Sequence, residues 1–207
     1  LPVVVNLLKS SKAADARTSK RTAASILSNL SQEPALQLPM LQCGALEPLL
    51  AACGSGEDVL EPEDPKNQLL ALFTLANLSS NEMLHGLLCG EDRPGSAQAI
   101  GSSRPGTAVS FDGDLTQSPP GTASVAPILQ VVLPLMREDV RPQSQRQRYA
   151  FAILTRLARS PSNQEHIGSH ATIYRRILVI LVRAEAEAAA ARQAVSLLSV
   201  LSVDPRN

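Results

Sequence analysis

Two histidines four residues apart have the spacing of a metal site. His166 and His170 follow Glu165, and on one α-helix this spacing would place two imidazoles on the same face, as a zinc ion requires. Gly168 lies between them, however, at a predicted joint between two helices. Because the two residues then belong to different elements, we expect no metal site here.

Other combinations of side chains do not indicate catalysis either. The sequence shows no nucleophile with a nearby base and no pair of carboxylates at a predicted cleft. The glycines at 54 and 56 do not follow a strand, so they fit no phosphate-binding pattern. The third histidine, His85, has no partner in the sequence. We therefore expect a protein that is not an enzyme, with no cofactor and no small-molecule substrate.

Polar residues at equivalent positions of a repeated helix are better candidates for binding. Asn29 and Asn77 lie near the ends of two predicted helices, away from their apolar stripes. An amide both donates and accepts hydrogen bonds, which suits the backbone of any peptide. Arg156 takes the same position in a third helix, with Arg159 one turn on, and guanidinium groups suit carboxylates and phosphates. The alternative for all of these is an ordinary solvated surface.

These residues belong to a helical pattern that occurs four times, at 21–31, 69–79, 148–158 and 192–202. In each copy a small residue is followed four positions later by leucine and three after that by another, which is one stripe of an α-helix. The stripes are Ala23, Leu27 and Leu30; Ala71, Leu75 and Leu78; Ala150, Leu154 and Leu157; and Ala194, Leu198 and Leu201. The second leucine advances by 48, 79 and 44 residues. A helical pattern at such a period predicts an all-α solenoid with one insertion.

The helices expected around this pattern come in the order short, short, long. Long helices are predicted at 11–31, 65–79, 143–160 and 185–203, and the remaining ones at 1–10, 33–43, 44–53, 81–90, 124–136, 161–168 and 171–183. We interpret 1–207 as a single domain with a partial repeat, 1–31, and fuller repeats at 32–79, 80–160 and 161–204. About half of residues 91–123 are Gly, Pro, Ser or Thr. We predict a disordered insertion there.

Two loop segments offer weaker candidates for contacts. The stretch 54–64 carries five carboxylates and no basic residue; we interpret it as a solvated turn, with contact to a basic neighbour as the alternative. The sequence Ser118-Pro119-Pro120 fits a phosphorylation site or a proline-rich docking motif. Such dipeptides are common in disordered segments, so the motif is weak.

Two short helices joined around a glycine, followed by a longer helix ending in ALxxLxNLS, resemble the armadillo repeat family. The closest matches are LPVVVNLLKS, RTAASILSNLS and QCGALEPLL. The resemblance implies a right-handed α-solenoid, or superhelix, whose third helices line a concave groove. The family's groove asparagine corresponds to Asn29, Asn77, Arg156 and Val200, and its groove tryptophan to Ser25, Phe73, Ala152 and Ser196. The tryptophan is thus absent throughout, unlike in the nuclear-import adaptors that bind basic peptides.

Composition narrows the choice of partner. Equal numbers of basic and acidic residues, 19 of each, give a formal net charge of zero, so no overall field favours nucleic acid or an anionic membrane. No apolar run approaches the ~20 residues that span a bilayer. Three cysteines without a CxxC pair suit a reducing compartment. We expect a cytoplasmic protein, with a cytoskeletal association or the nucleus as alternatives.

The leading hypothesis is a non-catalytic scaffold or adaptor that binds a partner polypeptide along the groove. The groove residues are then Ser25, Asn29, Phe73, Asn77, Arg156 and Arg159. Two alternatives stay open: a regulatory or substrate-recruiting region of a larger enzyme such as a ubiquitin ligase or kinase, and an architectural subunit of a cytoskeletal or axonemal assembly. The incomplete repeats at both ends predict that further repeats or a partner subunit cover them.

Overall fold

The computed structural model describes residues 1–9, 16–54, 60, 62–89, 127–136, 144–182 and 188–203. Within these ranges the regular elements are all helices, so the all-α prediction is confirmed there. The insertion expected at 91–123 and the motif Ser118-Pro119-Pro120 lie outside the described residues, as does most of the acidic loop. The elements are α1 (Pro2–Lys9), α2 (Ala16–Leu30), α3 (Pro34–Gln42), α4 (Leu46–Cys53), α5 (Pro65–Leu78), η2 (Glu82–Leu84), α6 (His85–Cys89), α7 (Pro127–Val132), η3 (Pro134–Met136), α8 (Gln145–Leu157), α9 (Pro161–Gly168), α10 (Ala171–Val182) and α11 (Ala188–Leu201).

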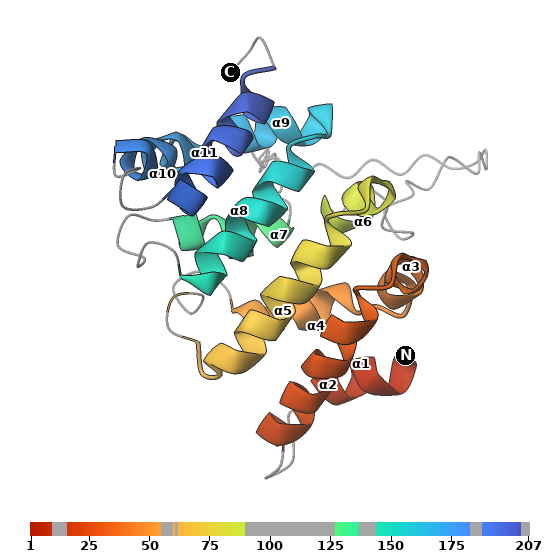
Figure 1. The fold of residues 1–207 in the computed structure, drawn as a ribbon. Helices are drawn as coiled ribbons and strands as arrows, with labels where there is room; N and C mark the ends of the chain where they lie inside the picture. The colour runs from red at the N-terminus through yellow and green to blue at the C-terminus, as the bar shows by residue number, and fades with distance from the viewer. Residues whose placement is uncertain are drawn as a thin grey trace, which may run out of the picture.

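The four helices that carry the repeated pattern, α2, α5, α8 and α11, lie side by side in sequence order (Figure 1). A second set, α1, α4, α7 and α10, packs against them, each against its own long helix. Within this second set, α1 contacts α4, α4 contacts α7, and α10 contacts η3. The long helices therefore form one layer of the molecule, and residues from neighbouring copies of the pattern meet at the seams between them.

The leucine and alanine stripes fill the space between the two layers. Ten of the twelve stripe residues are fully inaccessible to solvent: Ala23, Leu27, Ala71, Leu75, Leu78, Ala150, Leu154, Leu157, Ala194 and Leu201. The other two stripe residues, Leu30 and Leu198, are half-buried and pack against this core, and in α11 it is Leu197 that is fully buried with Ala194 and Leu201. Two adjacent leucines differ by about 100° around a helix, so a small rotation of α11 decides which of them enters the core.

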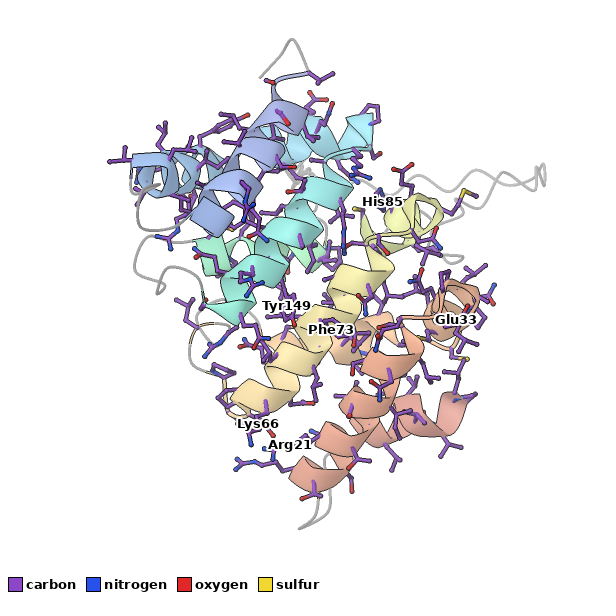
Figure 2. The ribbon with its side chains drawn as sticks, viewed as in Figure 1. Arg21, Glu33, Lys66, Phe73, His85 and Tyr149 are labelled. Atoms are coloured by element: carbon purple, nitrogen blue, oxygen red, sulfur yellow. The ribbon has the colours of Figure 1, made fainter. Side chains whose placement is uncertain are left out.

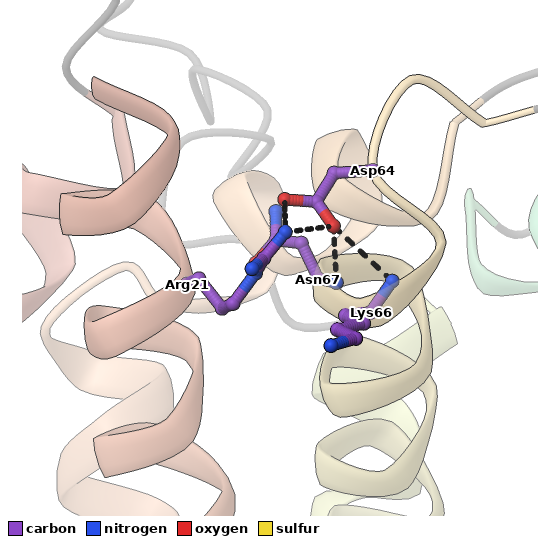
Figure 3. Close-up of polar contacts among 4 residues, drawn as sticks. All are labelled: Arg21, Asp64, Lys66 and Asn67. Atoms are coloured by element: carbon purple, nitrogen blue, oxygen red, sulfur yellow. Dashed lines mark hydrogen bonds and ion pairs between the residues drawn. The ribbon is translucent and has the colours of Figure 1, made fainter. Parts of the chain in front are cut away.

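The start of α5 is fixed by Asp64, which is followed by a proline in the first turn. Asp64 is the N-cap, and its Oδ1 accepts hydrogen bonds from the backbone N–H groups of Lys66 and Asn67, each at 3.2 Å. The same carboxylate accepts two hydrogen bonds from Arg21 Nη2 on α2, at 3.0 and 2.9 Å (Figure 3). One carboxylate thus starts α5 and holds it against α2.

Polar side chains bind the carbonyl groups at the ends of the long helices. Gln37 donates to Ser31 O at 2.9 Å, His85 Nε2 lies 2.9 Å from Ser79 O, and Asn163 donates to Leu157 O at 3.2 Å. Each of these side chains follows its carbonyl by six residues. Helix ends leave carbonyl groups without helical hydrogen-bond partners, and these side chains supply the missing donors. His85, for which the sequence showed no partner, has this structural role.

A second set of hydrogen bonds joins consecutive copies of the pattern. Gln37 Nε2 also donates to Asn77 O on α5, at 3.3 Å, and Gln164 Nε2 donates to Val200 O on α11, at 2.9 Å. Asn77 and Val200 are the positions that the repeat pattern makes equivalent. A glutamine after one long helix therefore binds the backbone of the next long helix at the same place.

Candidate functional site

A hollow of about 230 Å³ lies at the seam between α5 and α8 and reaches α11. Phe73 and Tyr149, labelled in Figure 2, come from α5 and α8 and meet there. The complete lining is Phe73, Ala76, Asn77, Gln145, Arg148, Tyr149, Ala152, Arg156 and Gln193. The α8 residues recur at intervals of three and four, so they form one stripe along a single face of that helix. The hollow is consequently elongated along α8.

Its apolar part is a pair of rings. Phe73 and Tyr149 are both half-buried, with ring centroids 5.6 Å apart and planes inclined by 60°, an edge-to-face contact. Ala152 lies one turn from Tyr149 on the same face of α8, and its small side chain leaves space beside the rings. The hollow therefore offers an aromatic surface with room for one apolar side chain.

Its charged part consists of two arginines without a carboxylate among the lining residues. Arg156 is half-buried and donates through Nη1 to the carbonyl oxygen of Ala76 on α5. Burial lowers the pKa of Arg156, and the neighbouring positive charge of Arg159 lowers it further. Arg148 is exposed and lies two turns earlier along α8. An anion entering the hollow would compensate the charge of Arg156, which its surroundings disfavour.

Asn77 lines the same hollow, and the structure holds its side chain in place. Its Nδ2 donates to Ser31 Oγ at 2.9 Å, and Ser31 Oγ in turn donates to Ser28 O at 2.7 Å. The backbone oxygen of Asn77 accepts from Gln37. Within the described residues, the side-chain oxygen of Asn77 has no hydrogen-bond partner. The amide is thus oriented from one side and keeps an acceptor for a ligand.

The six residues predicted to bind a partner divide into two groups. Phe73, Asn77 and Arg156 come together in the hollow. The others, Ser25, Asn29 and Arg159, do not line it: Ser25 is half-buried and Asn29 exposed on α2, while exposed Arg159 follows α8 and lies 3.7 Å from Glu82. Three of the six predicted residues thus line this hollow and three lie outside it.

Four lining residues were not anticipated: Gln145, Tyr149, Gln193 and Ala76. A signal for the first two was present, because counting back from Ala152 by three and by seven residues gives Tyr149 and Gln145 on the same helical face. Gln193 holds the repeat position of Tyr149, but its place in the lining also depends on how α11 packs beside α8. Arg146, two residues before Arg148 on α8, does not line the hollow and donates through Nη1 to the carbonyl of Leu60 at 3.1 Å.

Other kinds of site have less support. In the described part of the chain, no three His, Cys, Asp or Glu side chains gather closely enough to hold a metal ion. His170 follows the end of α9 at Gly168, so it does not share a helix with position 166. No described helix is both long and apolar enough to cross a membrane. Comparison with protein-family models and with curated protein sequences finds no match to this chain.

Proposed function

We propose that the chain is part of an armadillo-type solenoid that acts as a non-catalytic adaptor and holds a partner polypeptide on the face formed by its long helices. One observation carries this proposal. Phe73, Asn77 and Arg156, selected from the repeat pattern and from the resemblance to the armadillo family, line one hollow between neighbouring long helices. The three residues present an aromatic ring, an amide and a guanidinium group at one place on the long-helix face.

The chemistry of the hollow favours a polypeptide over a small reactive substrate. Its lining combines amide groups from Asn77, Gln145 and Gln193 with an aromatic pair and two guanidinium groups. Amides can satisfy both the N–H and the C=O groups of an extended backbone, and the rings can cover an apolar side chain. No thiol, imidazole or carboxylate stands among these lining residues to act as a base or nucleophile.

Selection from a random-peptide library displayed on phage tests the proposal. The Ala152→Phe variant places a ring in the hollow, and the matched Ala51→Phe variant places the same ring at an exposed position of α4. We expect selected peptides to bind the native chain and Ala51→Phe equally, and to bind Ala152→Phe at least about tenfold more weakly because the space is filled. Far-ultraviolet circular dichroism verifies that both variants fold.

Two outcomes would count against a peptide site at the α5–α8 seam. The first is a selection that yields no peptide. The second is a set of peptides that binds Ala152→Phe as tightly as the native chain. If those peptides instead lose affinity for Ala51→Phe, the binding surface lies on the layer of α1, α4, α7 and α10. That result would favour an architectural subunit that uses the face opposite the long helices.

A further inference from the structure

Building on the proposed peptide-binding function, we propose that the hollow selects an extended acidic segment in which two carboxylate side chains stand four residues apart with an apolar side chain midway between them. The carboxylates would pair with Arg148 and Arg156, and the apolar side chain would lie on Phe73 and Tyr149. The argument depends on the spacing, charge and surroundings of these residues.

The spacing of Arg148 and Arg156 along α8 matches that of side chains four positions apart on an extended peptide. Arg148 and Arg156 are eight residues apart on the same face of α8, which corresponds to about 12 Å along the helix axis. An extended peptide rises about 3.3 Å per residue, so positions four apart are separated by about 13 Å. Positions i, i+2 and i+4 of such a peptide point to the same side. Two side chains at i and i+4 therefore match the two arginines.

The middle position is set by the rings. Tyr149 and Ala152 lie between the two arginines on α8, and Phe73 faces Tyr149 from α5 at a centroid distance of 5.6 Å. A side chain at i+2 would point at this aromatic surface and at the space beside Ala152. Because the surface is apolar, an aliphatic side chain is the best match there.

The charge balance of the hollow selects an acidic partner. Its lining contains two cations and no anion, whereas nearby Arg159 has Glu82 at 3.7 Å. The chain as a whole has zero formal net charge, so it does not attract acidic molecules in general. Lowering of the Arg156 pKa by burial and by Arg159 agrees with a cation that lacks compensation. An acidic peptide would supply that compensation locally.

Carboxylates fit better than one phosphate group. A phosphate is bound most strongly when several donors converge on its oxygens. Here the two arginines are eight residues apart along α8, and Arg156 is also held by the Ala76 carbonyl. Two carboxylates at separate positions, each with a single charge, therefore match the two arginines better than one doubly charged phosphate group.

Fluorescence anisotropy with three labelled peptides tests the spacing. The probes contain the cores Glu-Ala-Leu-Ala-Glu, Ala-Glu-Leu-Glu-Ala and Gln-Ala-Leu-Ala-Gln. The first two have the same composition and charge and differ only in the spacing of the glutamates. We expect the first to bind about tenfold more tightly than the neutral probe, from two partly exposed ion pairs, and about threefold more tightly than the second.

Three matched variants test the residues. Arg148→Gln and Arg156→Gln should each weaken the first probe about threefold to tenfold, whereas Arg159→Gln, which removes the same charge outside the hollow, should change its affinity less than twofold. Arg148 is exposed and has no ion-pair partner in the described chain, so Arg148→Gln leaves folding intact and gives a result even if Arg156→Gln unfolds.

Equal affinity for the first two probes would overturn the spacing, and equal effects of Arg148→Gln and Arg159→Gln would overturn the assignment of the hollow. A probe with one phosphoserine that binds more tightly than the two-glutamate probe would overturn the choice of carboxylates. If peptides selected from the library depend on Ala152 but show no acidic preference, this inference is wrong while the proposed function stands. If the selected peptides bind Ala152→Phe as tightly as the native chain, both the proposed function and this inference are wrong.

Discussion

Replacing Asp64 separates the two tasks of one carboxylate. Asp64→Ala removes both the N-cap of α5 and the ion pair with Arg21, whereas Asp64→Asn keeps a good N-cap residue and loses the ion pair. An N-cap contributes about 1 kcal/mol. The Arg21 side chain is 42% exposed, so solvent screening limits the ion pair to about 0.5–1 kcal/mol. We expect Asp64→Ala to lower the free energy of unfolding by about 2 kcal/mol and Asp64→Asn by about half of that.

Urea unfolding followed by far-ultraviolet circular dichroism measures these losses. For a chain of this length, about 2 kcal/mol corresponds to a fall in Tm of about 4–8 °C. Arg21→Gln removes the ion pair from the other side and should cost about 0.5–1 kcal/mol. Lys66→Gln is the matched control, because Lys66 contributes only its backbone N–H to the cap. Its loss should stay below about 0.5 kcal/mol.

The pH dependence of the free energy of unfolding gives an independent test of the role of Asp64. Burial alone would raise the pKa of Asp64, but the hydrogen bond from Asn67, the hydrogen bond and charge of Arg21, and the hydrogen bond from Lys66 together lower it. A lowered pKa stabilises the fold above the unfolded value of about 3.9, and this stabilisation disappears as the pH falls through the folded pKa. The stability difference between the native chain and Asp64→Asn should therefore be full at neutral pH and shrink in acid. Equal stabilities of Asp64→Ala and Asp64→Asn at neutral pH, or a difference that grows in acid, would refute the reasoning.

Three further predictions concern the helix ends, the core and the thiols. Gln37→Leu should cost about 1–3 kcal/mol, because two carbonyls lose a donor, whereas exposed Gln42→Leu should cost little in the same urea titration. Leu75→Ala should cost about 2–5 kcal/mol, against less than about 1 kcal/mol for the partly exposed Leu38→Ala, since Leu75 is fully buried. Burial raises the pKa of the Cys53 thiol far above its usual range. Mass spectrometry after brief iodoacetamide treatment should therefore show the half-buried Cys43 and Cys89 modified before Cys53. Faster modification of Cys53 would contradict its burial.

The burial of the helix stripes could be predicted from the sequence, because an α-helix brings residues to the same face at a fixed spacing. A small residue and two leucines at helical spacing must lie on one face, and that face can be buried only against other apolar faces. Ala71, Leu75 and Leu78 are accordingly all fully buried. The half-buried position of Leu198 has the same origin, because α11 carries leucine at both 197 and 198. With two adjacent leucines the spacing rule does not determine which one faces the core.

The candidate site could be predicted only in part, because it is formed between helices. Phe73, Asn77 and Arg156 were found since each occupies a repeat position that points away from the core stripe. Tyr149 could have been found by counting back along α8. Gln193 holds the repeat position of Tyr149, but its contact with the hollow also depends on the placement of α11 beside α8, which no spacing within one helix determines.

The hydrogen bonds that close the long helices were beyond sequence reasoning for a different reason. Gln37, His85 and Asn163 perform the same task with an amide, an imidazole and a shorter amide. Any donor that can reach the carbonyl is sufficient, so residue type does not repeat where the task does. A pattern search that looks for identical residues misses such a feature, whereas a search for any polar side chain six or seven residues after the helix end would find it.

Two polar residues of the hollow, Asn77 and Arg156, also join neighbouring long helices. Asn77 on α5 binds Ser31 after α2, and Arg156 on α8 binds the carbonyl of Ala76 on α5. Their side chains are therefore ordered when the helices pack, and a ligand does not have to order them again, which favours affinity. The same arrangement means that one repeat alone cannot form the site. Substitutions that loosen the contact of α5 with α2 or α8, such as Asp64→Ala, should consequently weaken binding in the hollow even though Asp64 does not line it.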